Sequence, residues 1–164
     1  ERLVNEGVLK KVEYSHWTAP IVVVPKKSGT VCFCVDFKTG LNEALEMHQH
    51  PLPTPDEIFS KLNRGAWFTQ VDFADAYLQL EMDESSKELV TINTPKGLYQ
   101  YQRLPFGVKS APGIFQETMD NLTSGLNGCA AYLDDVIVTG TTLEEHNMNV
   151  FELFKRISDF GFRI

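Results

Sequence analysis

Two adjacent aspartates lie inside an apolar run of the sequence. Asp134 and Asp135 follow Ala130–Leu133 and precede Val136–Val138. Burying one ionised carboxylate costs free energy, and a second one beside it adds repulsion. The pattern therefore indicates either a turn dipeptide that reaches solvent or a site that binds a cation.

A third carboxylate stands at the end of another predicted strand. Residues 67–72 alternate as a strand, with Phe68, Gln70 and Asp72 on one face. Asp134 and Asp135 are expected to form the two-residue loop of a hairpin. Three carboxylates at strand ends are oxygen ligands of the kind that Mg²⁺ prefers. Two such ions, roughly 3.5–4 Å apart, stabilise the attacking and leaving oxygens of a phosphoryl transfer.

The elements that must position these carboxylates predict an α+β fold, an antiparallel sheet with helices on one face. They are a hairpin of 21–24 and 31–37, an extended proline-rich segment at 48–55, a helix from 55, a strand at 67–72, strands at 89–93 and 98–102, a helix from 110 to about 124, the hairpin around 134–135, and a helix after 142 that Gly161 ends.

Two helix starts have capping boxes, Thr54 with Glu57 and Thr142 with Glu145. Apolar stripes indicate which side of each of the last two helices is buried. The stripe residues are Phe115, Met119 and Leu122 in the first of these helices, and Leu143, Val150, Phe154 and Ile157 in the second.

The composition is that of an ordinary globular domain, with 43% hydrophobic and 23% charged residues in 164. No apolar run has the length of a membrane span, and the start at Glu1 suggests a piece of a longer polypeptide. The three cysteines have no zinc spacing and favour a reduced, intracellular setting. The net charge of −7 argues against nucleic acid as a partner, unless metal neutralises carboxylates and basic residues group locally.

Collinear blocks of the sequence resemble reverse transcriptases, most closely those of gypsy-class long-terminal-repeat retrotransposons. The blocks are "WTAPIVVVPKKSG", "CVDFKTGLN", "HPLPTPDEIFSKL", "FTQVDFADAYLQLEMDE", "YQRLPFGVKSAPGIFQETM", "YLDDVIVTG" and "TLEEHNMNVFELFKRISDFGFRI". The resemblance implies a right-hand polymerase with fingers at roughly 1–66 and 84–104, and palm at roughly 67–83 and 105–164. The family's thumb, connection and RNase H regions are expected beyond Ile164.

The resemblance also implies which residues act. The metal-binding and catalytic carboxylates are Asp72, Asp134 and Asp135, and the Phe73 carbonyl is a further ligand, for two Mg²⁺ or Mn²⁺ ions.

The implied nucleotide-binding residues are Lys26, Asp75, Ala76, Tyr77 and Phe106. Lys26 matches the γ-phosphate contact, although it also suits an ordinary solvated loop. Tyr77 matches the ring that excludes a 2′-hydroxyl, although it also suits a core aromatic.

Template and primer contacts are implied for Gly107, Lys109, Tyr132 and Leu133, and Arg103 is a further candidate for a nucleic-acid backbone contact. His48 and His50, two apart in the proline-rich segment, are weak candidates for metal ligation.

One position departs from the family pattern. Cys32 stands four residues before the Asp of "VDF", where the family usually has an arginine that grips the triphosphate. Cysteine provides neither a bidentate donor nor a permanent charge, so nucleotide affinity is expected to suffer unless another lysine substitutes. As a structural residue, Cys32 suits a small buried strand position.

The expected function is template-directed DNA synthesis from RNA or DNA by two-metal nucleotidyl transfer, within a Pol polyprotein. The expected partners are an RNA template, a DNA primer, deoxynucleoside triphosphates, and the thumb, RNase H and integrase of that polyprotein, with no membrane. The expected location is intracellular, in a cytoplasmic virus-like particle or the nucleus. The alternatives are a non-catalytic remnant that at most binds nucleic acid or a partner, and an RNA-templated RNA polymerase, against which Tyr77 argues.

Overall fold

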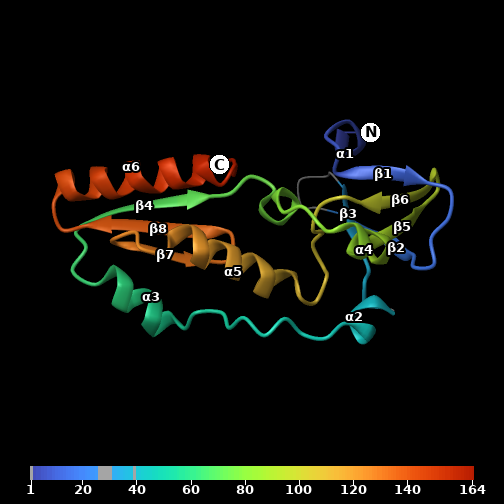
Figure 1. The fold of residues 1–164 in the computed structure, drawn as a ribbon, viewed down its shortest axis with the longest axis horizontal. Coiled ribbons are helices and arrows are strands. Elements are labelled where there is room, and N and C mark those ends of the chain that lie inside the picture. Colours follow the sequence, from blue (N-terminus) through green and yellow to red (C-terminus); the bar gives the residue numbers. More distant parts are fainter. Residues whose placement is uncertain (1, 26–30, 39) are drawn as a thin grey trace. The chain divides into compact units, whose positions relative to one another are not determined.

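The computed structural model of the chain describes residues 2–25, 31–38 and 40–164. Its elements run in the order α1 (Arg2–Asn5), β1 (Leu9–Val12), β2 (Ala19–Pro25), β3 (Val31–Val35), α2 (Leu41–Ala44), α3 (Pro55–Leu62), β4 (Trp67–Asp72), η1 (Ala76–Gln79), α4 (Glu84–Lys87), η2 (Glu88–Val90), β5 (Thr91–Thr94), β6 (Gly97–Tyr101), α5 (Ala111–Thr123), β7 (Cys129–Tyr132), β8 (Asp135–Gly140) and α6 (Leu143–Asp159), where η marks a 3₁₀ helix (Figure 1). Among the described residues, no helix is both long and apolar enough to cross a bilayer.

The chain divides into two compact units, each made of two stretches of sequence. The first unit is Glu1–Met47 with Tyr77–Ala111, and the second is His48–Ala76 with Pro112–Ile164. The assignment of residue ranges to fingers and palm stays a prediction.

The first unit contains a five-stranded sheet in the order β1-β6-β5-β2-β3. All neighbouring strands are antiparallel except β2 and β5. The predicted pairing of β2 with β3 is confirmed. Leu89 and Val90, predicted as strand, instead belong to η2, because the helical turn that Asp83 caps continues through Val90 and buries it.

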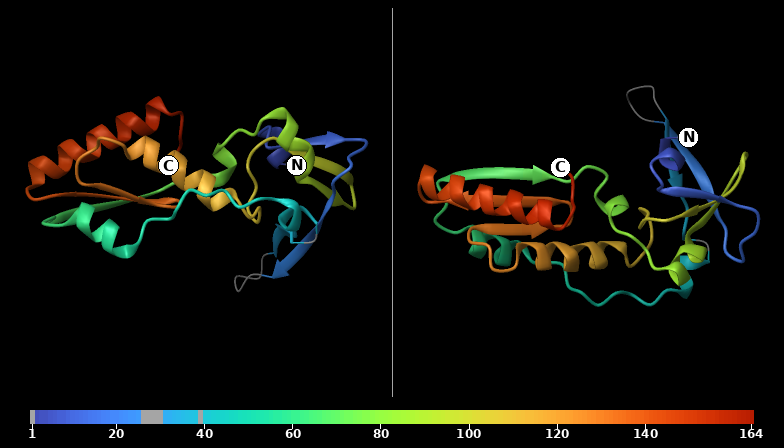
Figure 2. Two further views of the ribbon diagram at one scale, coloured as in Figure 1. Left: turned by 60° about the horizontal axis from the view of Figure 1, so that its bottom comes forward. Right: turned by 45° about the horizontal axis from the view of Figure 1, so that its top comes forward.

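The second unit contains the three-stranded antiparallel sheet β4-β8-β7, with α5 and α6 packed beside it (Figures 1 and 2). Its core is fully buried and comes from α5, α6 and β8. The hydrophobic residues of this unit with no exposed surface are Phe115, Met119, Leu122, Val136, Val138 and Leu153. The predicted stripe of α5 is therefore confirmed.

Helix α3 begins as predicted. The Thr54 side chain accepts from the Glu57 N–H, and the Glu57 carboxylate accepts from the Thr54 N–H at 2.6 Å. These contacts satisfy backbone donors that have no partner inside the helix.

Helix α6 differs from its predicted capping and from its predicted buried face. Thr142 caps the helix by accepting from the Glu145 N–H, but the Glu145 carboxylate reaches the Thr141 N–H at 2.7 Å instead of returning to Thr142. Leu143 and Phe154, predicted as buried stripe residues, are exposed.

The buried residues of α6 are His146, Leu153 and Ile157. A long-range contact explains this face, since His146 Nε2 lies 3.0 Å from Thr69 Oγ1 of β4. Because His146, Leu153 and Ile157 face the sheet, Leu143 and Phe154 both lie to one side of that buried face.

Candidate active site

Strands β4 and β8 place two of the predicted carboxylates side by side. Asp72 and Asp135 are direct partners in the antiparallel register, so their side chains lie on the same face of the sheet. Asp72 is exposed and Asp135 is half-buried. The Gln70 side chain, on the same face, donates to Asp135 Oδ1 at 2.8 Å.

The turn that carries Asp134 lies one residue earlier than predicted. Tyr132 pairs with Asp135, so the two loop residues are Leu133 and Asp134, and Asp135 is the first residue of β8. Leu133 has φ 52°, in the left-handed region of backbone conformation that residues other than glycine rarely adopt. Contacts from elsewhere in the fold therefore decide which two residues form the loop.

Backbone contacts bring the two aspartate segments together. The Phe73 N–H donates to the Asp134 carbonyl at 3.3 Å, directly after Asp72 leaves β4. Phe73 is buried and its ring packs edge-to-face against Phe115 and Phe162, with centroids 6.5 and 5.5 Å away. This aromatic cluster anchors the end of β4 next to the turn.

The surroundings of the three carboxylates explain why the fold tolerates their negative charges. None is fully buried, and within the described parts of the chain no lysine or arginine forms an ion pair with Asp72, Asp134 or Asp135. Each carboxylate therefore keeps some exposure to solvent, and no cationic side chain of the described residues occupies the place of a metal ion.

The donor set fits a magnesium ion in its chemistry. Over residues 2–25, 31–38 and 40–164, no three His, Cys, Asp or Glu side chains form a ready-made metal cage. Mg²⁺ does not need such a cage, because it keeps several waters and binds through one or two carboxylates plus substrate phosphates. The adjacent Asp72 and Asp135 supply that number, with Asp134 next to them in the turn.

The predicted nucleotide residues that follow Phe73 take different environments. Asp75 is exposed with φ 50°, whereas Ala76 is buried at the start of η1.

In the first unit, Tyr77 is buried with 7% exposure, and Phe106 is exposed. Their rings meet edge-to-face with centroids 4.6 Å apart. The structure therefore brings these two predicted residues together.

Gly107 and Lys109 are held by a residue that sequence reasoning did not select. The Asn42 amide donates to the Gly107 carbonyl and accepts from the Lys109 N–H, both at 2.8 Å. Gly107 has φ 94°, and a Cβ there would lie 3.3 Å from the Val35 carbonyl oxygen. A lone asparagine has no spacing signal, so only this pairing reveals its role.

Other predicted residues take varied positions. Tyr132 is exposed and Leu133 is half-buried. Arg103 donates to the Gln79 carbonyl and pairs with Glu81 at 3.0 Å. Lys26 lies outside the described residues, and the Cys32 backbone pairs with Val24 in the hairpin of β2 and β3.

Gln116 is a second residue that sequence reasoning missed. It lies in α5 with no exposed surface, and its amide oxygen accepts from the Leu133 N–H at 2.7 Å. A polar residue within the apolar pattern of α5 was the only available signal.

Comparison with known proteins identifies the family. The model of the reverse transcriptase (RNA-dependent DNA polymerase) family matches residues 24–164, and the chain belongs to this family.

Similar proteins include an uncharacterized protein of Caenorhabditis elegans, 47% identical over 99% of this chain and 13% of that protein. The retrovirus-related Pol polyprotein from transposon 297 of Drosophila melanogaster is 34% identical over 100% of this chain and 16% of its own length. The chain thus spans well under a quarter of these relatives. The predicted similarity to gypsy-type retrotransposons is confirmed.

The fold is that of a reverse transcriptase polymerase domain. The structure of the foamy viral protease-reverse transcriptase in complex with double-stranded DNA has a TM-score of 0.88 to this chain. Sequence identity is 22%, over 98% of this chain and 28% of the other. The predicted α+β class is confirmed.

Proposed function

We propose that the chain is the polymerase part of a larger Pol polyprotein and extends a DNA primer on an RNA or DNA template. The observation that carries this proposal is the register that sets Asp72 beside Asp135, next to the Asp134 turn, with no cationic side chain of the described residues paired to them. Membership of the reverse transcriptase family supports the same reaction.

In this proposal Asp72, Asp134 and Asp135, with the Phe73 carbonyl, hold two Mg²⁺ ions, or Mn²⁺ in their place. The ions supply charge stabilisation to the attacking 3′-oxygen and the leaving pyrophosphate. The chain's own contribution is to set these oxygen ligands on two paired strands, where the register keeps their spacing constant.

The nucleotide is proposed to bind at Lys26, Asp75, Ala76, Tyr77 and Phe106. The burial of Tyr77 and its contact with Phe106 support a rigid ring that leaves no room for a 2′-hydroxyl. Replacing it with a smaller side chain should therefore admit ribonucleotides, and a Tyr77→Ala enzyme that still rejects them would contradict this role.

The nucleic acid is proposed to contact Gly107, Lys109, Tyr132 and Leu133. The exposed Tyr132 ring next to the turn supports a contact with the primer end, and the exposed Lys109 supports a phosphate contact. Thumb, RNase H and integrase regions of the same polyprotein are the proposed partners, within a virus-like particle or the nucleus.

Metal-dependent primer extension tests the proposal. The longest chain that contains this segment is given a DNA primer on an RNA template with Mg²⁺, alongside Asp134→Asn. An Asp159→Asn variant is the matched control, because it removes the same charge from the exposed end of α6. Extension should be lost in Asp134→Asn alone, and a folded wild-type chain that extends nothing would overturn the proposal.

Cys32 favours a second candidate, a non-catalytic remnant of a polymerase. If the missing arginine is the defect, Cys32→Arg should raise primer extension at low deoxynucleotide concentration by at least about tenfold, the value of a charge-assisted hydrogen bond. Cys34→Arg is the matched control, because it adds the same charge two residues along the same strand. Equal behaviour of both variants would rule out the missing arginine as the defect.

A further inference from the structure

The outer edge of β7 is closed by a side chain instead of a strand. In the sheet order β4-β8-β7, no strand of the described residues pairs with the far side of β7. The Gln116 amide donates to the Ala131 carbonyl at 3.1 Å and accepts from the Leu133 N–H at 2.7 Å. One buried amide thus pairs with two backbone groups, as a strand would.

This contact acts on the strained residue of the turn. Leu133 has a positive φ, a conformation that persists only when the surroundings hold it. Its N–H is fixed by Gln116, and the next residue in the chain is Asp134. The placement of Asp134 therefore depends on the orientation of the Gln116 amide.

Asp120 reinforces the orientation that the Ala131 carbonyl and the Leu133 N–H require. The Gln116 NH₂ group donates to Asp120 Oδ1 at 3.0 Å, one helical turn further along α5. An ionised carboxylate only accepts hydrogen bonds, so the NH₂ group must face Asp120 and Ala131. The amide oxygen is then left facing the Leu133 N–H.

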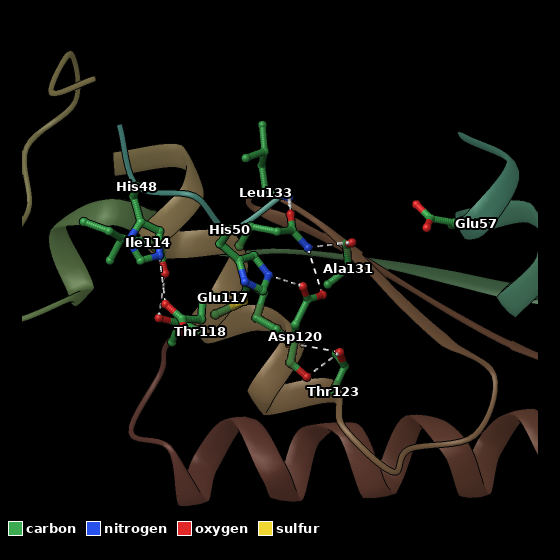
Figure 3. A network of polar contacts seen from close by, with 12 residues as sticks. His48, His50, Glu57, Ile114, Glu117, Thr118, Asp120, Thr123, Ala131 and Leu133 are labelled. Atoms are coloured by element: carbon green, nitrogen blue, oxygen red, sulfur yellow. Dashed lines mark hydrogen bonds and ion pairs between the residues drawn. The ribbon is translucent and has the colours of Figure 1, made fainter. Parts of the chain in front are cut away.

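Asp120 is in turn held by the segment that precedes α3. The imidazole Nε2 of His50 lies 2.7 Å from Asp120 Oδ2, the oxygen that Gln116 does not use (Figure 3). His50 belongs to residues 48–54, here called the connector. The two oxygens of Asp120 thus join the connector to the amide that holds the turn.

The connector passes close against α5. A Cβ on Gly113 would lie 3.2 Å from His48 Cδ2 and 3.3 Å from the His48 carbonyl oxygen, so glycine at this helical position permits the approach. His48 makes a similar contact with α5, in which its Nε2 lies 2.9 Å from Glu117 Oε2. That second pair has the same chemistry, but within the described residues neither His48 nor Glu117 forms a hydrogen bond with Gln116 or with the turn. The pair is therefore an internal control (Figure 3).

We infer that His50, Asp120 and Gln116 are positioning residues, which hold the Leu133–Asp134 turn in place through a continuous chain of hydrogen bonds. His50 and Asp120 orient the Gln116 amide, and that amide holds the Leu133 N–H. The turn that contains Leu133 also carries the proposed metal ligand Asp134. The consequence for catalysis rests on the proposed function, whereas the hold on the turn does not.

The rate of hydrogen exchange at the Leu133 backbone amide directly tests whether Gln116 holds the turn. In the longest folded chain that contains this segment, Asp120→Ala removes both accepting oxygens and should speed this exchange about fivefold to tenfold, the scale of one hydrogen bond. Glu117→Ala is the matched control and should leave it unchanged. Both side chains are partly exposed on α5, so both variants should fold.

A second pair of variants tests His50. His50→Gln retains a donor toward Asp120 and should keep the Leu133 amide protected, whereas His50→Ala should speed its exchange. If Asp120→Ala and Glu117→Ala change the exchange equally, or if neither changes it, these hydrogen bonds do not hold the turn and the inference fails.

Primer extension adds the catalytic readout. Asp120→Ala should lower kcat with little change in the KM for deoxynucleotide, because the turn carries the proposed metal ligand Asp134 and not the nucleotide pocket. Equal loss in Glu117→Ala would overturn the catalytic part. If the wild type extends nothing but Asp120→Ala still speeds Leu133 exchange, the proposed function fails, whereas the inference that these residues hold the turn stands.

Discussion

The two faces of the sheet β4-β8-β7 have opposite characters although they share the same strands. Val71, Val136 and Val138 are buried on one face, here called the covered face. Gln70, Asp72 and Asp135 occupy the other face, here called the open face, where Asp72 is exposed and Asp135 is half-buried. Since side chains alternate along a strand, Asp135 and the fully buried Val136 are consecutive residues.

Residues that stabilise the fold and residues proposed to act in catalysis therefore alternate along the same strands. The covered face supplies apolar burial, and its substitutions should change the free energy of unfolding. The open face carries carboxylates that contribute little burial, and its substitutions should change activity. The following predictions test that separation, starting with the largest effect.

Asp135→Asn should lower primer extension by at least about 100-fold, because Asp135 is a proposed metal ligand and such a ligand contributes several kcal/mol of transition-state stabilisation. Its free energy of unfolding should not fall, since removing one of two neighbouring carboxylates relieves repulsion. Extension assays and urea unfolding of the same sample check both statements. A loss of stability as large as that from a core substitution would break the separation of the two faces.

Phe115→Ala should destabilise the fold by about 3–5 kcal/mol, because it leaves a cavity at a fully buried aromatic. Phe68→Ala is the control on the open face, where the ring is 57% exposed, and should stay within about 0.5 kcal/mol. Urea unfolding gives both values. Similar costs for the two phenylalanines would show that the open face is also part of the core.

Thr142→Ala should cost about 1 kcal/mol, because the side chain caps α6 by accepting from the Glu145 N–H. Thr142→Ser keeps the accepting oxygen and should recover most of the loss. Thermal unfolding measures both. Equal losses in the two variants would mean that the cap does not support the helix.

The smallest expected effect is a pH dependence at the same helix start. Hydrogen bonds from the Thr141 hydroxyl, and then from the Thr141 N–H, hold the pKa of the Glu145 carboxyl below its ordinary value of 4.5. Because the folded-state pKa is the lower one, this stabilisation is present above pH 4.5 and is lost as the pH falls through the folded-state pKa.

Unfolding measured between pH 7 and pH 3 checks this dependence. Glu145→Gln should lose less stability than the wild type over that range, since its amide does not titrate. Identical pH profiles would show that the Thr141 contacts do not favour the charged carboxyl.

Local patterns predicted much of the second unit correctly. The capping box of Thr54 and Glu57, the alternation of β4 and the stripe of α5 each depend on residues close in sequence. Hydrogen bonds within one turn and the periodicity of an element are local properties, so they are legible without the fold.

Contacts between distant segments decided the features that were predicted wrongly or missed. The turn at Leu133 and Asp134 follows the pairing of Tyr132 with Asp135 and the hold of Gln116 from α5. The buried face of α6 follows the contact between His146 and Thr69.

The sequence by itself identified the three aspartates, the strand that ends at Asp72 and the family that these residues indicate. Only the tertiary structure decided that Asp72 lies opposite Asp135, and that His50 reaches the turn through Asp120 and Gln116. The physical reason is that strand register and side-chain networks join residues far apart in the chain, and no local periodicity encodes which atoms then meet.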